Sequence, residues 1–296
     1  MTTDSLLSVF VNKSAYVSDT DNVFKTDLHN AKVYIYENNI CIDSLYHNWS
    51  HGYNQLEKSD SYIYGQGNYL SKGMKPLPGH EYKIVVKAPG SPDATACTRI
   101  PNMVRIEHID TTTVLKWVQT IYGGSYNYGV SHLDTITTVN KIMKCNIEFT
   151  DPGNETNYYL FNICSVSEAK GSYRYWPFIC KDPVVEEKIV TKNDPIQGIV
   201  FSDKIINGKK YSLTVDLYTS FDMDPFSPYF RDKSTFYFRL YSIPEAYYKY
   251  IQSLNLYNAK FGKPLSEPVQ VYSNITGGLG IFAGAAVSAD SIVFRL

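Results

Sequence analysis

Few residues in this 296-residue chain have the types and spacing needed for metal chemistry. His47 and His51 lie four positions apart, the spacing that would place two imidazoles on one face of a helix as metal ligands. The residues between them do not have a helical pattern, and no Glu directly follows the first His, as a metalloprotease motif requires. We therefore interpret both as surface histidines and predict no metal site. Asp151 to Asn157 offers hard oxygens but lacks the ladder of a calcium loop, so we expect a β-turn there.

Residues for nucleophilic or acid–base catalysis are present but are not arranged in a motif. Cys164 or Cys180 could act as a nucleophile with His132 as its base, yet neither lies in a nucleophile motif. Two acidic pairs could serve a glycosidase, but that mechanism depends on a carboxylate separation that only a fold can set. The pairs are Asp222 with Asp224 and Glu186 with Glu187. We favour a protein that is not an enzyme, with a β-sandwich hydrolase as an alternative.

Glycines are concentrated after an alternating, strand-like run from Val269 to Ile275. Residues 278–283 fit the G-x-G-x-x-A dinucleotide fingerprint, but that motif needs a following helix, a second strand and an acidic residue about 20 positions on. The chain ends at Leu296, so we expect no bound cofactor here. We predict a structural junction whose glycines adopt positive φ or lie against a neighbouring strand. They are Gly277, Gly278, Gly280 and Gly284.

Aromatic residues offer more for binding than the polar residues offer for catalysis. Two clusters lie in segments rich in Gly, Ser and Pro, where rings could stack on a sugar or grip a peptide or protein partner. The same rings could instead cover a sheet, because tyrosine is amphipathic. The candidate ligand- or partner-binding residues are Tyr122, Tyr126, Tyr128, Tyr173, Tyr175 and Trp176.

Composition favours pleated sheet and gives no sign of nucleic-acid binding. The chain has 26 tyrosines, against 14 phenylalanines and three tryptophans, on a background rich in Thr, Ser, Val and Ile. With 28 basic and 29 acidic residues the net charge is −1, so no basic surface for nucleic acid or an anionic membrane is indicated. The chain opens without a signal-peptide pattern and contains no run of 18 apolar residues.

Hydrophobic alternation predicts a mainly β protein in two parts. Residues 1–101 contain short strands separated by turns, which is typical of a small Ig-like β-sandwich. Residues 102–296 continue as a larger antiparallel β domain, sandwich or barrel-like, with longer strands. One helix is expected at about 244–260, because Ser242 and Glu245 have capping-box spacing and aromatic residues then recur at helical spacing. We expect its aromatic stripe to pack on the sheet.

Turn residues predict how several strands are connected. Asn38-Asn39 suits a tight turn, and Gly123-Gly124 and Asp151–Asn154 have turn compositions. Asn207-Gly208 predicts a hairpin between residues 198–201 and 211–217.

Several stretches together resemble one known family. The most specific are Tyr247–Tyr250, Glu267–Ile275 and Gly277–Phe282; the weaker ones are Asn30–Glu37, Leu77–Tyr82, Thr98–Pro101 and Phe149–Tyr158. They are similar to a large Bacteroidetes family of exported lipoproteins, domain of unknown function 4249, and the resemblance spans nearly the whole chain.

The resemblance implies a location and a partner. Members carry a lipoprotein signal and an acylated cysteine, and many are encoded beside a TonB-dependent outer-membrane receptor. We therefore expect a surface- or periplasm-facing lipoprotein whose lipid anchor has been removed from the chain as given. The resemblance leaves open whether the first strand was removed with it. Export would place its five cysteines in an oxidising compartment, where at most two pairs could form. The expected function is an accessory to the receptor in nutrient uptake, with a glycan- or peptide-binding module as the alternative.

Overall fold

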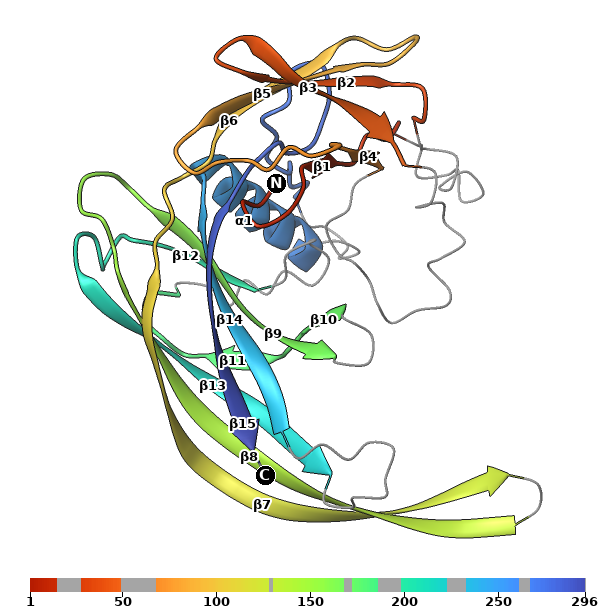
Figure 1. Cartoon of the computed structure of the whole chain (residues 1–296), viewed down its shortest axis with the longest axis vertical. Helices are drawn as coiled ribbons and strands as arrows, with labels where there is room; N and C mark the ends of the chain where they lie inside the picture. The colour runs from red at the N-terminus through yellow and green to blue at the C-terminus, as the bar shows by residue number, and fades with distance from the viewer. Residues whose placement is uncertain are drawn as a thin grey trace.

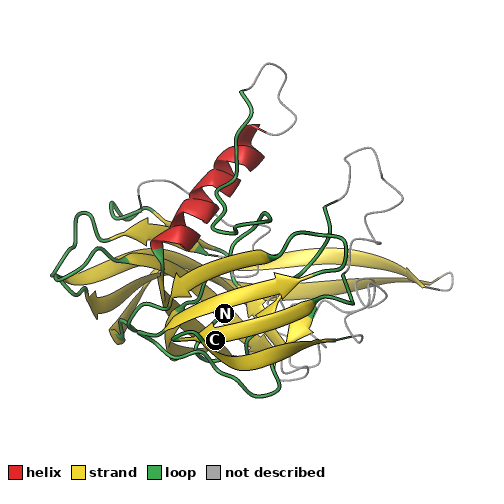
Figure 2. Ribbon diagram, turned by 90° about the horizontal axis from the view of Figure 1, so that it is seen from above, coloured by secondary structure: helices red, strands yellow, loops and turns green. Residues whose placement is uncertain are grey.

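The computed structural model describes residues 1–14, 28–48, 68–127, 130–167, 172–185, 198–222, 233–260 and 267–295 (Figure 1). The described chain is mainly antiparallel strands with one helix, which confirms the predicted fold class. Three sheets form, one from residues before 100 and two from the remainder. Figure 2 shows the helix standing over the strands, with one strand pair reaching past the others.

The first sheet has six strands in the described part of the chain. In spatial order they are β1 (Ser8–Val9), β4 (Tyr69–Leu70), β3 (Ile40–His47), β2 (Lys32–Glu37), β5 (Glu81–Lys87) and β6 (Ala94–Arg99). The strand β3 pairs with β2 through its first residues and with β4 through Tyr46 and His47. Asn38 and Asn39 have φ of 49° and 63°, so the tight turn predicted between β2 and β3 is confirmed.

The core of this sheet includes residues from the C-terminal part of the chain. Val33, Ile35 and Ile84 point inward at alternate positions, as the period of two requires. Phe282 and Ala286, from nearly 200 residues later, pack into the same cluster. The first sheet therefore shares its core with residues beyond position 101. The predicted division into two domains at that position stays a prediction.

The other two sheets pack face to face. One has the order β10 (Ser172–Tyr175), β9 (Tyr158–Ser167), β14 (Lys233–Ile243), β15 (Ala286–Arg295), with β12 (Ile199–Ser202) beside β10 on the same edge of β9. The other has the order β11 (Phe178–Cys180), β13 (Lys210–Asp222), β8 (Val130–Thr150), β7 (Ile106–Asn127). The buried side chains between them include Phe161, Ile163, Phe236 and Phe238 from the first of the two and Ile147, Phe149, Leu213 and Val215 from the second. Burying each contributes about 1.5–3 kcal/mol.

The helix α1 (Glu245–Lys260) lies where the sequence places it and covers the outer face of the β9–β14–β15 sheet. Ile251 is fully buried, and the rings of Tyr247 and Tyr250 pack beside it, so the predicted packing of the aromatic stripe on the sheet is confirmed. The predicted capping box does not form: Ser242 lies in β14 and its hydroxyl accepts a hydrogen bond from the Val104 amide. No helix in the described ranges has the length and apolar character needed to cross a bilayer.

Two predicted connections are wrong. Gly123 and Gly124 do not make a turn; they continue β7 and pair with Asp134 and Leu133 of β8. The segments flanking Asn207-Gly208 do not pair with each other, since β12 joins β9 and β13 joins β8. Gly208 still turns the chain at φ +68°, so the turn is local but leads from one sheet into the other.

Candidate functional site

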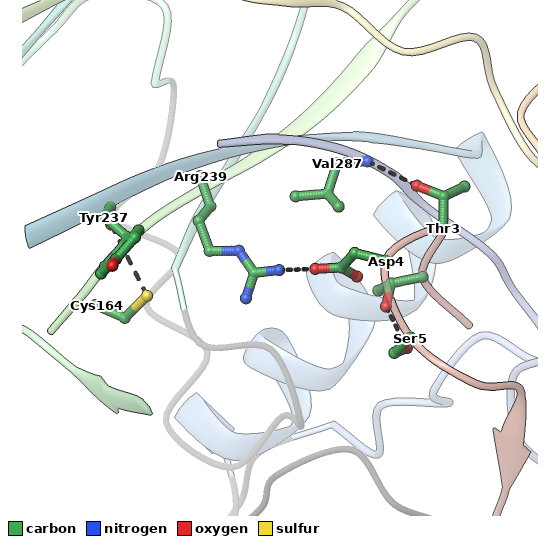
Figure 3. A network of polar contacts seen from close by, with 8 residues as sticks. Thr3, Asp4, Ser5, Cys164, Tyr237, Arg239 and Val287 are labelled. Atoms are coloured by element: carbon green, nitrogen blue, oxygen red, sulfur yellow. Dashed lines mark hydrogen bonds and ion pairs between the residues drawn. The ribbon is translucent and has the colours of Figure 1, made fainter. Parts of the chain in front are cut away.

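A group of polar side chains interrupts the outer face of the β9–β14–β15 sheet, beside the part that α1 covers (Figure 3). Arg239 of β14 lies directly between Asn162 of β9 and Ala289 of β15 in the antiparallel register. Its neighbours in sequence, Phe238 and Leu240, are fully buried on the opposite face. The strand's period of two therefore turns Arg239 to the outer face, where directly opposed residues also point.

Arg239 is held by an aromatic ring and a carboxylate. Its guanidinium carbon lies 5.2 Å from the centroid of the Tyr241 ring, a cation–π distance. The Arg239 Nη2 also pairs with Asp4 Oδ2, as Figure 3 shows. Burial lowers the pKa of Arg239, but the nearby Tyr241, Asp4, Cys164 and Tyr175 together raise it, so the pKa is raised overall. The side chain is therefore a permanent cation, only 16% exposed, whereas that of Asp4 is 43% exposed.

Asp4 is brought to Arg239 by the first residues of the chain, which lie along the start of β15. The Thr3 amide donates to the Ala285 carbonyl at 3.1 Å, and the Ala285 amide donates to the Met1 carbonyl at 2.9 Å. The Val287 amide donates to Thr3 Oγ1 at 3.3 Å, a contact drawn in Figure 3. These bonds position the backbone next to Asp4 without using its carboxylate.

Asn162 is a buried member of this group whose side-chain polar atoms are not satisfied by hydrogen bonds from described residues. It is 1% exposed, and neither its Nδ2 nor its Oδ1 makes a hydrogen bond with a residue in the described ranges. An unsatisfied buried polar group costs about 1–3 kcal/mol, so such a side chain is usually completed by water or a ligand. We call Asn162, Arg239, Tyr241 and Asp4 the Arg239 site.

Of the six predicted aromatic residues, the structure describes the side chains of Tyr175 and Trp176, which lie in different surroundings. Tyr175 of β10 is opposite Cys164 of β9, one row beyond Arg239 on the outer face. Trp176 instead packs with the inner core: its indole N–H donates to the Tyr218 carbonyl at 2.6 Å, and its ring meets Phe236 edge-on at 5.1 Å. Tyr128 and the side chains of Tyr122, Tyr126 and Tyr173 lie outside the described residues.

The cysteines considered as nucleophiles are buried thiols. Burial raises the pKa of Cys164 and of Cys180 to about 11, so both remain protonated at neutral pH. The side chain of His132, their proposed base, lies outside the described residues. All five cysteines are free. The two exposed ones, Cys41 and Cys97, occupy one row across β3, β2, β5 and β6, roughly 14 Å apart and too far for a disulfide.

The remaining polar candidates have structural surroundings or fall outside the description. The His47 ring packs edge-on against Tyr69 at 5.2 Å, whereas His51 is not described. Within the described ranges, no group of three His, Cys, Asp or Glu side chains could hold a metal. The acidic pairs are not described either: Asp224, Glu186, Glu187 and the Asp222 side chain lie outside. Asp151 is 2% exposed and accepts hydrogen bonds from the Tyr159 hydroxyl and the Gly208 amide.

Three of the four C-terminal glycines, Gly277, Gly278 and Gly284, lie against residues of the first sheet or the residue that follows it. Gly277 has φ of +80°, and a Cβ there would lie 2.2 Å from the Asp93 carbonyl oxygen. Gly280 has φ of +129°, and a Cβ on Gly284 would lie 2.6 Å from Ile100 Cγ1. Thr276 forms a β-bridge with Thr95 of β6. The cluster thus closes the junction between the first sheet and β15.

A second surface was not found by sequence reasoning. Among the described strands β7 pairs only with β8, and from residue 112 to 120 its side chains are exposed on both faces. Figures 1 and 2 show this hairpin reaching beyond the other strands. The β7 surface is formed by Val114 (59% exposed), Leu115 (51%), Trp117 (38%) and Val118 (58%). Its signal in the sequence is an apolar run that does not alternate.

The fold and these two surfaces define a multi-sheet antiparallel β protein with a polar site on one sheet and an exposed apolar edge strand. The chain belongs to the family described as Domain of unknown function (DUF4249), whose model matches residues 2–291. No curated protein matches the chain.

Proposed function

We propose that this protein is a non-enzymatic outer-membrane lipoprotein that serves as an accessory or substrate-binding partner of a TonB-dependent nutrient receptor. The resemblance of its sequence motifs to exported lipoproteins supports the anchor, the location and the kind of partner. The exposed β7 surface is the observation that carries a docking role. The alternative, a glycan- or peptide-binding module that acts alone, is favoured by the outer-face position of Tyr175 beside the Arg239 site.

The β7 surface has the properties of a protein-docking strand. An edge strand presents unpaired backbone groups, and soluble proteins usually protect such edges with charge, proline or short length. Residues 112–120 contain one lysine and no proline, and they lie within a 22-residue strand. A partner strand added at this edge would place side chains beside both faces at once, so it would cover Leu115 and Val118 better than a partner docked on one face.

The receptor partnership is tested by purifying the full-length lipoprotein from native membranes. We expect a TonB-dependent receptor to accompany it, and the double substitution Leu115→Asp and Val118→Asp to reduce the co-purified receptor by at least about tenfold, because two carboxylates would be desolvated at the interface. Ile205→Asp is the matched control, since Ile205 is an aliphatic residue 48% exposed outside β7. Absence of a receptor with the unaltered protein would refute the partnership, and equal recovery with the double variant would refute docking through β7.

A further inference from the structure

We infer that the Arg239 site binds the carboxylate of a ligand, and that Asp4 occupies the position of that carboxylate in the structure. The ligand chemistry that fits is a carboxylate next to an amide, as at the C-terminus of a peptide. This inference does not depend on the receptor partnership.

The two side chains of the Arg239–Asp4 ion pair differ in burial. Arg239 belongs to a paired central strand and is 84% buried as a side chain, whereas Asp4 approaches from the solvent side and is 43% exposed. A buried guanidinium requires an anion, and a planar fork of donors matches a carboxylate. Any carboxylate that enters from the same side can satisfy that requirement.

The Asp4 side chain can move away from Arg239 without disturbing the fold around it. The adjacent backbone is fixed to β15 by bonds from Thr3 and Met1, none of which uses the Asp4 carboxylate. Rotation of this partly exposed side chain into water would remove Asp4 from the Arg239 Nη2 while the segment stayed in place. Exchange therefore requires a side-chain movement and no loss of strand pairing.

The carboxamide of Asn162 supplies hydrogen-bonding groups beside Arg239. It faces the same side of the sheet as Arg239, directly across the β9–β14 pair, and is 1% exposed. Neither polar atom makes a hydrogen bond within the described part of the chain, so the carboxamide offers one donor group and one acceptor. A peptide amide presents the complementary acceptor and donor. Asp4 pairs with the cation, and the Asn162 carboxamide remains available to a second group of the ligand.

The test uses N-acetylglycine, which carries an amide beside a carboxylate, in isothermal titration of the full chain. We expect the variant Asp4→Ala to bind it at least about tenfold more tightly than the unaltered protein, because Asp4 no longer competes. Adding Arg239→Gln to Asp4→Ala should weaken binding at least about tenfold through loss of a charged hydrogen bond. Asp93→Ala is the matched control, since Asp93 pairs with Lys87 at 3.6 Å on the surface.

Further arms separate the parts of the site. N-acetylglycinamide should not bind. Acetate should bind Asp4→Ala more weakly than N-acetylglycine does, whereas the two ligands should bind Asp4→Ala/Asn162→Leu with equal affinity. If Asp4→Ala is too unstable to titrate, N-acetylglycine should raise its melting temperature with increasing concentration and N-acetylglycinamide should not. The inference is overturned if Asp4→Ala shows no saturable binding or ligand-dependent stabilisation, or if adding Arg239→Gln leaves its affinity for N-acetylglycine unchanged.

Discussion

The substitution Gly277→Ala is expected to lower the free energy of unfolding by about 3 kcal/mol. Gly277 has φ of +80°, where a side chain is strained, and the new Cβ would lie 2.2 Å from the Asp93 carbonyl oxygen. Because that oxygen belongs to backbone at the start of β6, the clash is relieved only by separating the glycine junction from the first sheet. Urea denaturation of the variant and the unaltered chain measures the difference.

Gly278→Ala is the matched control for this change. A Cβ on Gly278 would meet Ile275 Cγ2 at 3.4 Å and the Ala94 Cβ at 3.5 Å, which are ordinary contacts. We expect its effect to stay within about 1 kcal/mol. Equal stabilities for the two variants would show that the backbone at Gly277 moves to accommodate the Cβ. The junction would then not fix the first sheet to β15.

Loss of the Asp151 carboxylate is the second change with a large expected effect. Asp151→Ala should destabilise the chain by about 2–4 kcal/mol, because the buried Tyr159 hydroxyl and the Gly208 amide each lose an acceptor. The side chain joins the turn after β8 to the turn before β13, so both turns should loosen together. Calorimetric unfolding and amide exchange at Gly208 measure the two effects.

The variant Asp151→Asn isolates the contribution of charge. Burial raises the pKa of Asp151 in the folded chain, so the folded state holds its proton to higher pH than the unfolded state does. This group therefore stabilises the protein most below the unfolded pKa, and that contribution is lost as the pH rises through the raised folded pKa. The stability of the unaltered chain relative to Asp151→Asn should rise as the pH falls through this window. A constant difference would contradict the raised pKa.

Local signals in the sequence were sufficient for several elements. The helix is found at Glu245–Lys260 because its aromatic spacing and the glycine and proline that follow are properties of one short segment. The Asn38-Asn39 turn is likewise encoded by the two residues that adopt positive φ. Strand pairing is not local in this way. Asn207-Gly208 would make a turn whether its flanking strands paired with each other or entered different sheets. Contacts of β12 with β9 and of β13 with β8 decide that they enter different sheets.

The Arg239 site had no signal that could be found without the fold. Asp4 and Arg239 are 235 positions apart, and Asn162 is an isolated amide in an apolar strand. Trp176 was predicted to bind ligand from its place in a loop-like run, but the chain crosses there between two sheets and the ring packs with the core. The β7 surface was visible as an apolar run, yet only the fold shows that its side chains are exposed on both faces of the strand.

The central claim, docking through β7, is tested most directly by a photo-crosslinking residue placed at Val118 in cells that carry the native membranes. We expect irradiation to join Val118 to a TonB-dependent receptor, and the same group at Ile205 to give no such product. A receptor crosslink at Ile205 but none at Val118 would contradict it.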